Sequence, residues 1–316
     1  TLGGLLKEIN LTKSEINKVL KILAVESPSP VAKQGNRWSA TPVNYKLDHQ
    51  RIQKLIALRQ KEQSEMMNYM GTSQCLMEFL GQALDDEKAR PCGKCANCAG
   101  KNIVPTDCSA GLANQASLFL KRSFVMIPPR RQWPADAFHN YTSFRGRIRD
   151  ELRAEEGRAL STWGDSGWGQ LVRDGKYKDG HLPDELIEGC LEMIQAWNPN
   201  PQPSWMTCIP SLTHSSLLPD FTRRLAAALG LPFELCIIKA RHTRPQKEML
   251  NSTQQASNLD GAFQIISNRW IGEPVYLVDD LVTSRWTLTI AAALLRQTGC
   301  PAVFPLALSQ NPRGQD

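Results

Sequence analysis

Four of the nine cysteines in this chain of 316 residues lie between positions 75 and 98, as Cys75 followed by Cys92, Cys95 and Cys98. Thiolates two residues apart can turn tightly around a metal ion, and zinc takes four such ligands in a tetrahedron. Gly93 favours the turn inside the first pair. We therefore expect these four side chains to hold a structural Zn²⁺, whose binding energy folds the segment around it. Cysteine runs of this kind also ligate iron–sulfur clusters, and that alternative stays open here.

The residues in front of the cysteine run have the apolar pattern of two helices. The first is predicted over residues 47–70 with Gly71 at its end, and the second over residues 74–84. The sequence therefore predicts a helical hairpin that leads into a cysteine-rich turn. The methionines of the first apolar stripe, which we expect to pack in a core, are Met66, Met67 and Met70.

This hairpin, with Cys75 on its second helix and Cys92-Gly-Lys-Cys95-Ala-Asn-Cys98 after it, resembles the zinc subdomain of RecQ-type DNA helicases. In that family the metal is structural and the four thiolates complete its coordination sphere. The resemblance implies that the chain handles single-stranded or forked DNA in repair or recombination. In most RecQ proteins a winged helix follows the zinc subdomain, whereas the candidate in this chain precedes it.

That candidate is residues 1–45. Thr12-Lys-Ser-Glu15 forms a capping box, in which the Thr hydroxyl accepts from an amide three residues on and the Glu reaches back. An amphipathic helix follows, and two short strands are expected over residues 31–33 and 37–40. Helix, capped helix and basic hairpin together resemble a winged helix-turn-helix, which predicts DNA contacts from Lys13 and Arg37.

Residues 201–316 alternate short apolar strands with helices, which is typical of an α/β domain built on a parallel sheet. Strands are expected over residues 205–210, 235–239, 275–278 and 302–308, and helices over residues 217–229 and 287–298. The run from Val275 to Thr287 resembles the PRPP-binding motif of type I phosphoribosyltransferases, and its surroundings look most like the ComF-type branch. The expected fold class is thus an α+β N-terminal part followed by an α/β phosphoribosyltransferase-like domain.

In that family a strand ends in two acidic residues that hold the ribose hydroxyls, and the next helix N-terminus cradles the 5′-phosphate. The family has Gly after its Thr/Ser pair, whereas Arg285 and Trp286 follow here, and Trp286 is expected to fill space that a ligand would use. We therefore expect phosphate or nucleotide binding without transfer; the alternative is an active PRPP-dependent transferase with a zinc-stapled appendage. The residues implied are Asp279, Asp280, Thr283, Ser284, Arg285 and Thr287.

The middle region, residues 104–200, interleaves basic and aromatic residues, as single-stranded DNA surfaces do. Residues 1–150 hold 22 Lys/Arg against 13 Asp/Glu, a net +9, while residues 151–316 hold 15 against 18, a net −3. A polyanion is therefore expected to meet the N-terminal half. The DNA-binding residues predicted in the middle region are Arg130, Arg131, Trp133, Arg145 and Arg147.

The expected organisation is a winged-helix-like unit over residues 1–45, a zinc hairpin over 46–103, a basic middle domain over 104–200 and a phosphoribosyltransferase-like domain over 201–316. Neither a GxxxxGK[ST] phosphate loop nor a DEAH-type box occurs, so helicase motor domains are expected before Thr1 in a longer protein. This arrangement resembles the RqlH-type branch of RecQ-like helicases. No long apolar run or export signal is evident, which favours a protein of the cytoplasm with no membrane partner. The resemblance implies that it is bacterial and nucleoid-associated.

Overall fold

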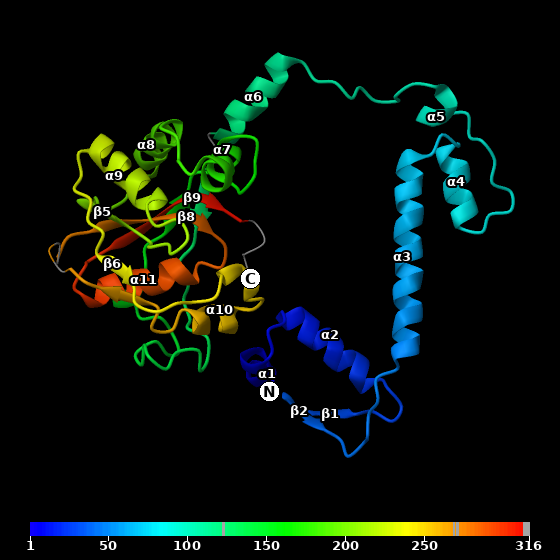
Figure 1. Ribbon diagram of the computed structural model, residues 1–316, viewed down its shortest axis with the longest axis horizontal. Helices are drawn as coiled ribbons and strands as arrows, with labels where there is room; N and C mark the ends of the chain where they lie inside the picture. Colours follow the sequence, from blue (N-terminus) through cyan, green and yellow to red (C-terminus); the bar gives the residue numbers. More distant parts are fainter. Residues whose placement is uncertain (122–123, 268, 270–271, 312–316) are drawn as a thin grey trace. The chain divides into compact units, whose positions relative to one another are not determined.

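The computed structural model describes residues 1–121, 124–267, 269 and 272–311 (Figure 1). The backbone divides into two compact units: the larger unit comprises Thr1–Thr41 and Asn114–Asp316, and the smaller unit comprises Pro42–Ala113. No described helix is both long and apolar enough to cross a membrane.

A mostly parallel sheet forms the centre of the larger unit. Its described strands number five and follow the order β3-β4-β9-β8-β5. Strands β4, β9, β8 and β5 pair in parallel, and β3 adds to the edge in antiparallel fashion. The expected middle region therefore supplies strands to the same sheet as the expected C-terminal domain. The strands are β3 (Val125–Ile127), β4 (Gly157–Ala159), β5 (Trp205–Cys208), β8 (Val275–Val282) and β9 (Val303–Gln310).

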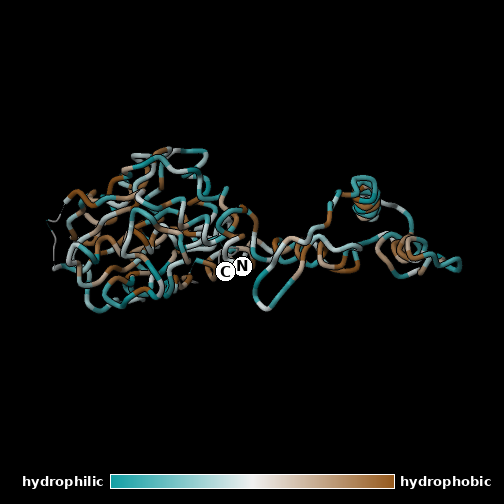
Figure 2. Tube along the Cα trace, turned by 90° about the horizontal axis from the view of Figure 1, so that it is seen from below, coloured by the Kyte–Doolittle hydropathy of each residue, from teal (hydrophilic) through white to brown (hydrophobic). Residues whose placement is uncertain are grey.

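Different helices cover the two faces of this sheet. Side chains alternate along β8, so Val275 and Leu277 pack in the apolar cluster that contains helix α11, whereas Tyr276 and Val278 pack in the cluster with α7, α8 and α9. Figure 2 shows apolar segments crossing the interior of the larger unit, with hydrophilic loops outside. Helix α6 (Ala110–Lys121) begins in the smaller unit and continues into the larger one. The helices and helical turns after it are η1 (Asp150–Leu152), α7 (Trp168–Asp174), the π-helix η2 (Gly175–Asp179), α8 (Glu185–Trp197), α9 (Leu217–Leu229), η3 (Gln246–Glu248), α10 (Ser252–Asn258) and α11 (Trp286–Gln297).

One expected strand pairs differently from the prediction. Residues 235–239 were expected in the parallel sheet, but β6 (Ile237–Lys239) pairs in antiparallel fashion with β7 (Phe263–Ile265) in a separate ribbon. The physical reason lies just before β6, where Phe233 already bridges to Met206 at the outer edge of β5. The chain then leaves that edge, so β6 finds its hydrogen-bond partner elsewhere.

The N-terminal elements have the order that the sequence predicts. The capping box is confirmed, because the Thr12 hydroxyl accepts from the Glu15 amide at 3.2 Å and the Glu15 carboxylate accepts from the Thr12 amide at 2.8 Å. Ile16 and Leu20 are the buried residues of this capped helix. Membership of the winged-helix class stays a prediction. The elements are α1 (Leu2–Glu8), α2 (Lys13–Ala24), β1 (Val31–Gln34) and β2 (Arg37–Ala40).

Side-chain amides attach these N-terminal elements to the rest of the larger unit. Asn251, the N-cap of α10, donates to the carbonyls of Ile9 at 3.2 Å and Leu11 at 2.9 Å. Asn10 donates in turn to the carbonyl of Glu248 at 2.7 Å. Because these bonds use the backbone of the α1–α2 connection, they fix where α2 begins relative to α10.

The smaller unit consists of helices α3 (His49–Gly71), α4 (Leu76–Ala83) and α5 (Ala96–Ala99). Helix α3 packs against α4 near its C-terminal end, where the rings of Tyr69 and Phe79 lie 5.7 Å apart. Within this unit the rest of α3 is not packed against another helix, and the described part of the helix contains no buried residue. The prediction that the methionine stripe is core is therefore wrong: Met66, Met67 and Met70 are 59%, 60% and 70% exposed.

Candidate functional site

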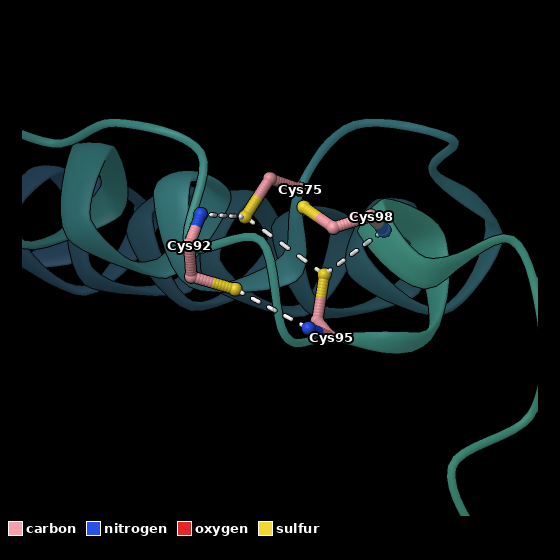
Figure 3. Close-up of side chains that lie close together, drawn as sticks. All are labelled: Cys75, Cys92, Cys95 and Cys98. Carbon is pink, nitrogen blue, oxygen red and sulfur yellow. Dashed lines mark hydrogen bonds between the residues drawn. The ribbon is translucent and has the colours of Figure 1, made fainter.

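The four predicted zinc ligands lie together in the smaller unit (Figure 3). Cys75 is the N-cap of α4 and Cys95 the N-cap of α5, while Cys92 and Cys98 belong to the loop and helix around them. All four sulfur atoms lie within 4.8 Å of one another. Gly93 takes a φ of +68° in the tight turn, which is a conformation that suits glycine.

Backbone amides point at these sulfur atoms. The amide of Cys92 donates to Cys75 Sγ at 3.2 Å, and the amides of Leu76 and Cys98 donate to Cys95 Sγ at 3.4 Å each. The amides of Cys98 and Leu76 lower the pKa of the Cys95 thiol to about 6. Such donors stabilise a thiolate, which is the form that binds metal.

The spacing fits a single tetrahedral ion. Four sulfurs about 2.3 Å from a central metal stand roughly 3.8 Å from one another, and the Sγ atoms of Cys95 and Cys75 are 3.8 Å apart. An iron–sulfur cluster places several iron and sulfide atoms between its thiolates and needs a wider cage. The donor set and its size are therefore compatible with a metal ion such as zinc.

A second candidate site lies in the larger unit, on strand β8. The strand is longer than predicted and runs through Val282, so the two acidic residues lie inside it rather than at its end. Asp279 is 8% exposed. Burial, together with the neighbouring charge of Asp280, raises the pKa of Asp279 to about 8. At neutral pH the Asp279 carboxyl is therefore largely protonated and can donate a hydrogen bond.

Sequence reasoning did not identify the partner of Asp280. The ammonium of Lys176 lies 2.7 Å from an Asp280 carboxylate oxygen, and both side chains are mostly buried, at 16% and 14% exposed. Burial lowers the pKa of Lys176, but the charge and hydrogen bond of Asp280 outweigh it, so the net shift is upward. Lys176 lies in the π-helical turn η2, a local irregularity that is frequent at functional sites. Its charge balances that of the Asp280 carboxylate.

The loop after β8 is built on a strained residue. Arg285 has a φ of +67° at the N-cap of α11, a conformation in which non-glycine residues are uncommon. Its guanidinium donates to the carbonyl of Pro128 at 3.1 Å, and Arg130 donates to the carbonyl of Ser284 at 2.8 Å. Burial and the nearby charge of Arg285 lower the pKa of Arg130 to about 10. The hydrogen bonds of these two guanidinium groups therefore fix the backbone of this loop to the residues around Pro128.

A small cavity of about 60 Å³ lies against this loop. Trp286 does not fill it, contrary to the prediction: this side chain is 1% exposed and packs beneath the loop, with its ring centroid 6.1 Å from that of Trp133. The reason is that α11 begins at Trp286 and turns its indole toward the apolar cluster. The lining residues are Gln246, Asp279, Leu281, Val282, Thr283, Ser284, Arg285, Thr287 and Leu288.

The predicted basic residues of the middle region gather on one short antiparallel ribbon. Gln132 bridges to Arg147, the Trp133 amide donates to the Gly146 carbonyl at 2.8 Å, and the Ile148 amide donates to the Arg131 carbonyl at 2.9 Å. Apolar side chains of the two segments point inward and arginines outward. We call Arg131, Arg145 and Arg147, which are all exposed, the basic ribbon.

Two of the predicted DNA contacts are placed differently by the structure. Trp133 is 5% exposed and lies between Phe144, whose ring is stacked on it at 4.2 Å, and the ring of Trp286. It has no free face for a base, so the predicted stacking role is wrong. Arg130 is half-buried beneath the loop after β8, where it serves that loop. Lys13 and Arg37 are exposed, as a DNA contact requires.

No protein-family model matches the chain, and no curated protein matches it. Among solved structures the chain is similar to an adenine phosphoribosyltransferase at 16% sequence identity, over 61% of this chain and 89% of that chain, with a TM-score of 0.30. It is also similar to the adenine phosphoribosyltransferase of Saccharomyces cerevisiae in complex with adenine and an imino-altritol bisphosphate, at 15% identity over 62% of this chain and 89% of that chain, with a TM-score of 0.30. At these identities and TM-scores, neither an activity nor a ligand follows for this chain.

Proposed function

We propose that this chain is the DNA-handling part of a RecQ-like DNA helicase that acts in repair or recombination. In this proposal a zinc ion stabilises the fold of the helical hairpin. Exposed cations bind single-stranded or forked DNA. Motor domains elsewhere in a longer protein supply ATP hydrolysis. The phosphoribosyltransferase-like domain binds a phosphate group and transfers nothing. The compact cage of four cysteine sulfurs on a helical hairpin supports the zinc part of the proposal.

The observation that carries DNA binding is the basic ribbon. Buried Phe144 and Ile148 flank Arg145 and Arg147, and Gly146 between these arginines has a φ of +64°. The apolar neighbours hold the backbone, so both guanidinium groups project from a fixed base. Each phosphate that such a group neutralises releases about one counterion, which makes the binding salt-dependent.

The direct test is to replace Arg145 and Arg147 together by Ala and to measure binding to a fluorescent single-stranded oligonucleotide. Affinity should fall about tenfold at low salt while the protein stays folded. The matched control replaces Lys88 and Arg90, two exposed cations that follow the acidic stretch Asp85-Asp86-Glu87. Equal losses in both double variants would show that net charge rather than the basic ribbon governs binding.

The Lys176–Asp280 ion pair supports the proposal that no phosphoribosyl group is transferred. A ribose that is held by the acidic pair must replace the ammonium at 2.7 Å, and breaking a mostly buried pair is costly. Incubation with PRPP and each common nucleobase should therefore release no pyrophosphate above the buffer rate. Turnover that Asp280→Asn abolishes would contradict this part of the proposal.

The second candidate, an active transferase, draws on one observation. Asp279, Thr283 and Thr287 line the same small cavity, as a site for PRPP would require. The pyrophosphate assay separates this candidate from the proposed function.

A further inference from the structure

Helix α3 has an apolar stripe that the described part of the smaller unit leaves open. Helix α4 lies beside only the C-terminal end of α3, where the ring of Phe79 contacts that of Tyr69 (Figure 1). The apolar side chains of the stripe recur three and four residues apart, so they share one face of the helix. Five of these six side chains are exposed, and Ile52 is half-buried. We call them the α3 stripe: Ile52, Leu55, Ile56, Met66, Met67 and Met70.

The α3 stripe has the same spacing when it is read from either end. Its members form three pairs that lie nine, six and five residues on either side of position 61. The pairs are Ile52 with Met70, Leu55 with Met67, and Ile56 with Met66. Two copies of α3 that run antiparallel about this midpoint therefore bring each aliphatic side chain opposite a methionine. A contact with two-fold symmetry requires such a self-complementary surface.

The centre of α3 continues the same pattern with polar side chains. Positions 52, 56, 59, 63, 66 and 70 are separated alternately by four and three residues, which is the spacing of a coiled-coil seam. The two central positions, Arg59 and Gln63, also lie symmetrically about position 61. Polar residues inside such a seam can fix its register. Glu62 lies 2.6 Å from the Arg59 guanidinium in the same helix, so the charge at the centre is balanced within each copy.

The charges along α3 favour an antiparallel arrangement. Residues 49–59 hold three basic side chains and no acidic one, a net +3, whereas residues 60–71 hold Lys61 against Glu62 and Glu65, a net −1. An antiparallel pair places the basic half of one helix beside the acidic half of the other, and it also opposes the two helix dipoles. A parallel pair would place the two basic halves side by side.

We propose that two copies of this chain associate through antiparallel α3 helices, with the α3 stripe as the interface. A helix of 23 residues is about 34 Å long. One such helix from each copy gives an interface at the small end of the stable class, so we expect a dissociation constant on the order of 10 µM. The antiparallel arrangement places the two cysteine cages at opposite ends of the helix pair, because Gly71 of each copy lies ten residues beyond the midpoint, about 30 Å from the other. No residue of the basic ribbon takes part, so dimerisation can be tested independently of DNA binding.

Sedimentation equilibrium of the full zinc-bound chain tests this association. Between about 1 and 200 µM, a range that brackets the expected constant, the mass should rise from that of one chain toward that of two. Met66→Glu places a charge in the α3 stripe of each copy and should weaken association at least about tenfold. The matched control is Asn68→Glu, which adds the same charge at an exposed position on the other side of the helix and should leave association unchanged. Circular dichroism should show equal helicity in the two variants.

A wild-type mass of one chain over the whole concentration range would overturn the proposal and leave the α3 stripe to another part of a longer protein. Equal effects of Met66→Glu and Asn68→Glu would also overturn it, because association would then not use this face.

Cysteine cross-linking tests the antiparallel register. Ile56→Cys and Met66→Cys are introduced together in a Cys108→Ser background, which removes an exposed thiol outside the cage. Mild oxidation of the zinc-bound protein should join two chains, because position 56 of one copy lies opposite position 66 of the other. Each single cysteine variant should stay unlinked, since its two copies lie about 15 Å apart along the helix axis, beyond the reach of a disulfide. Cross-linking of the single variants would show a parallel pair, and a double variant that does not cross-link would rule out this register; either result contradicts the proposal.

Discussion

Lys176 and Asp280 form an ion pair of 2.7 Å in the interior of the larger unit, where neither side chain is more than 16% exposed. The pair joins a π-helical turn to the strand that carries the acidic motif. The Lys176 ammonium thereby balances the charge of the Asp280 carboxylate inside the protein.

Breaking this ion pair should destabilise the fold. Lys176→Met leaves Asp280 buried without its counter-charge, and we expect the free energy of unfolding to drop by about 3 kcal/mol. The double variant Lys176→Met with Asp280→Asn should recover most of this loss, because no buried charge is then left alone. Chemical denaturation of the wild type, of Lys176→Met, of Asp280→Asn and of the double variant gives the coupling energy. Additive losses would show that the two side chains do not depend on each other.

Stability should also depend on the protonation of Asp279. Its pKa is raised from 3.8 to about 8 in the folded protein by burial and by Asp280. Between these values the folded state binds more protons at this site than the unfolded state, so this contribution is complete below about pH 4 and is lost as the pH rises through 8. Lys176 also faces Asp279, and it stays charged over this range.

The control for this pH effect is Asp279→Asn, which keeps the shape of the protonated carboxyl. Denaturation midpoints measured from pH 5 to pH 8.5 should decline less in this variant than in the wild type. Parallel declines in the two proteins would assign the pH dependence to other groups.

Metal binding should be confined to the cysteine cage. We expect one zinc ion per chain by elemental analysis, and Cys95→Ser should lose it together with the helicity of the smaller unit, since structural zinc supplies folding energy. Cys108→Ser is the matched control, because Cys108 is an exposed cysteine outside the cage. Iron in place of zinc, with absorption in the visible range, would refute the assignment.

The helix from Leu217 to Leu229 was predicted with the bounds that the structure has, because its amphipathic pattern is local and ends at Gly230. The cysteine cage could be predicted equally well, since three of its ligands are neighbours in the sequence. The ion pair of Lys176 could not be predicted, because its partner Asp280 lies on another element and no local pattern marks a lysine as buried. Charge patterns alone do not reveal buried ion pairs.

For Trp133 the sequence predicts a functional role that the structure does not support. An aromatic residue next to two arginines has the composition of a DNA surface, but the residues of an extended ribbon alternate between its two faces. Alternation exposes Arg145 and Arg147 and buries Phe144 and Ile148, and the Trp133 indole packs on this buried side, between Phe144 and Trp286. The attachment of α1 and α2 to α10 through Asn10 and Asn251 was also missed, because two asparagines in loops give no signal of a long-range contact.

Replacement of Trp133 should therefore affect folding rather than DNA recognition alone. Trp133→Ala empties a stacked aromatic site and should lower the free energy of unfolding by about 3–5 kcal/mol. Arg131→Ala, a change at an exposed position two residues away, should leave it within about 0.5 kcal/mol. A Trp133→Ala protein of unchanged stability that had lost only DNA binding would restore the stacking role.

The most direct test of the account is the salt dependence of DNA binding by the full chain. Fluorescence anisotropy with a labelled single-stranded oligonucleotide, repeated between 50 and 300 mM salt, gives the slope of the logarithm of the association constant against that of the salt concentration. Single strands contribute about 0.7 to this slope for each phosphate contacted. We predict a slope of about −2 if only the three arginines of the basic ribbon contact phosphates, and of about −3.5 if Lys13 and Arg37 contact them too. No measurable binding at 50 mM salt, or binding that salt does not change, would contradict it.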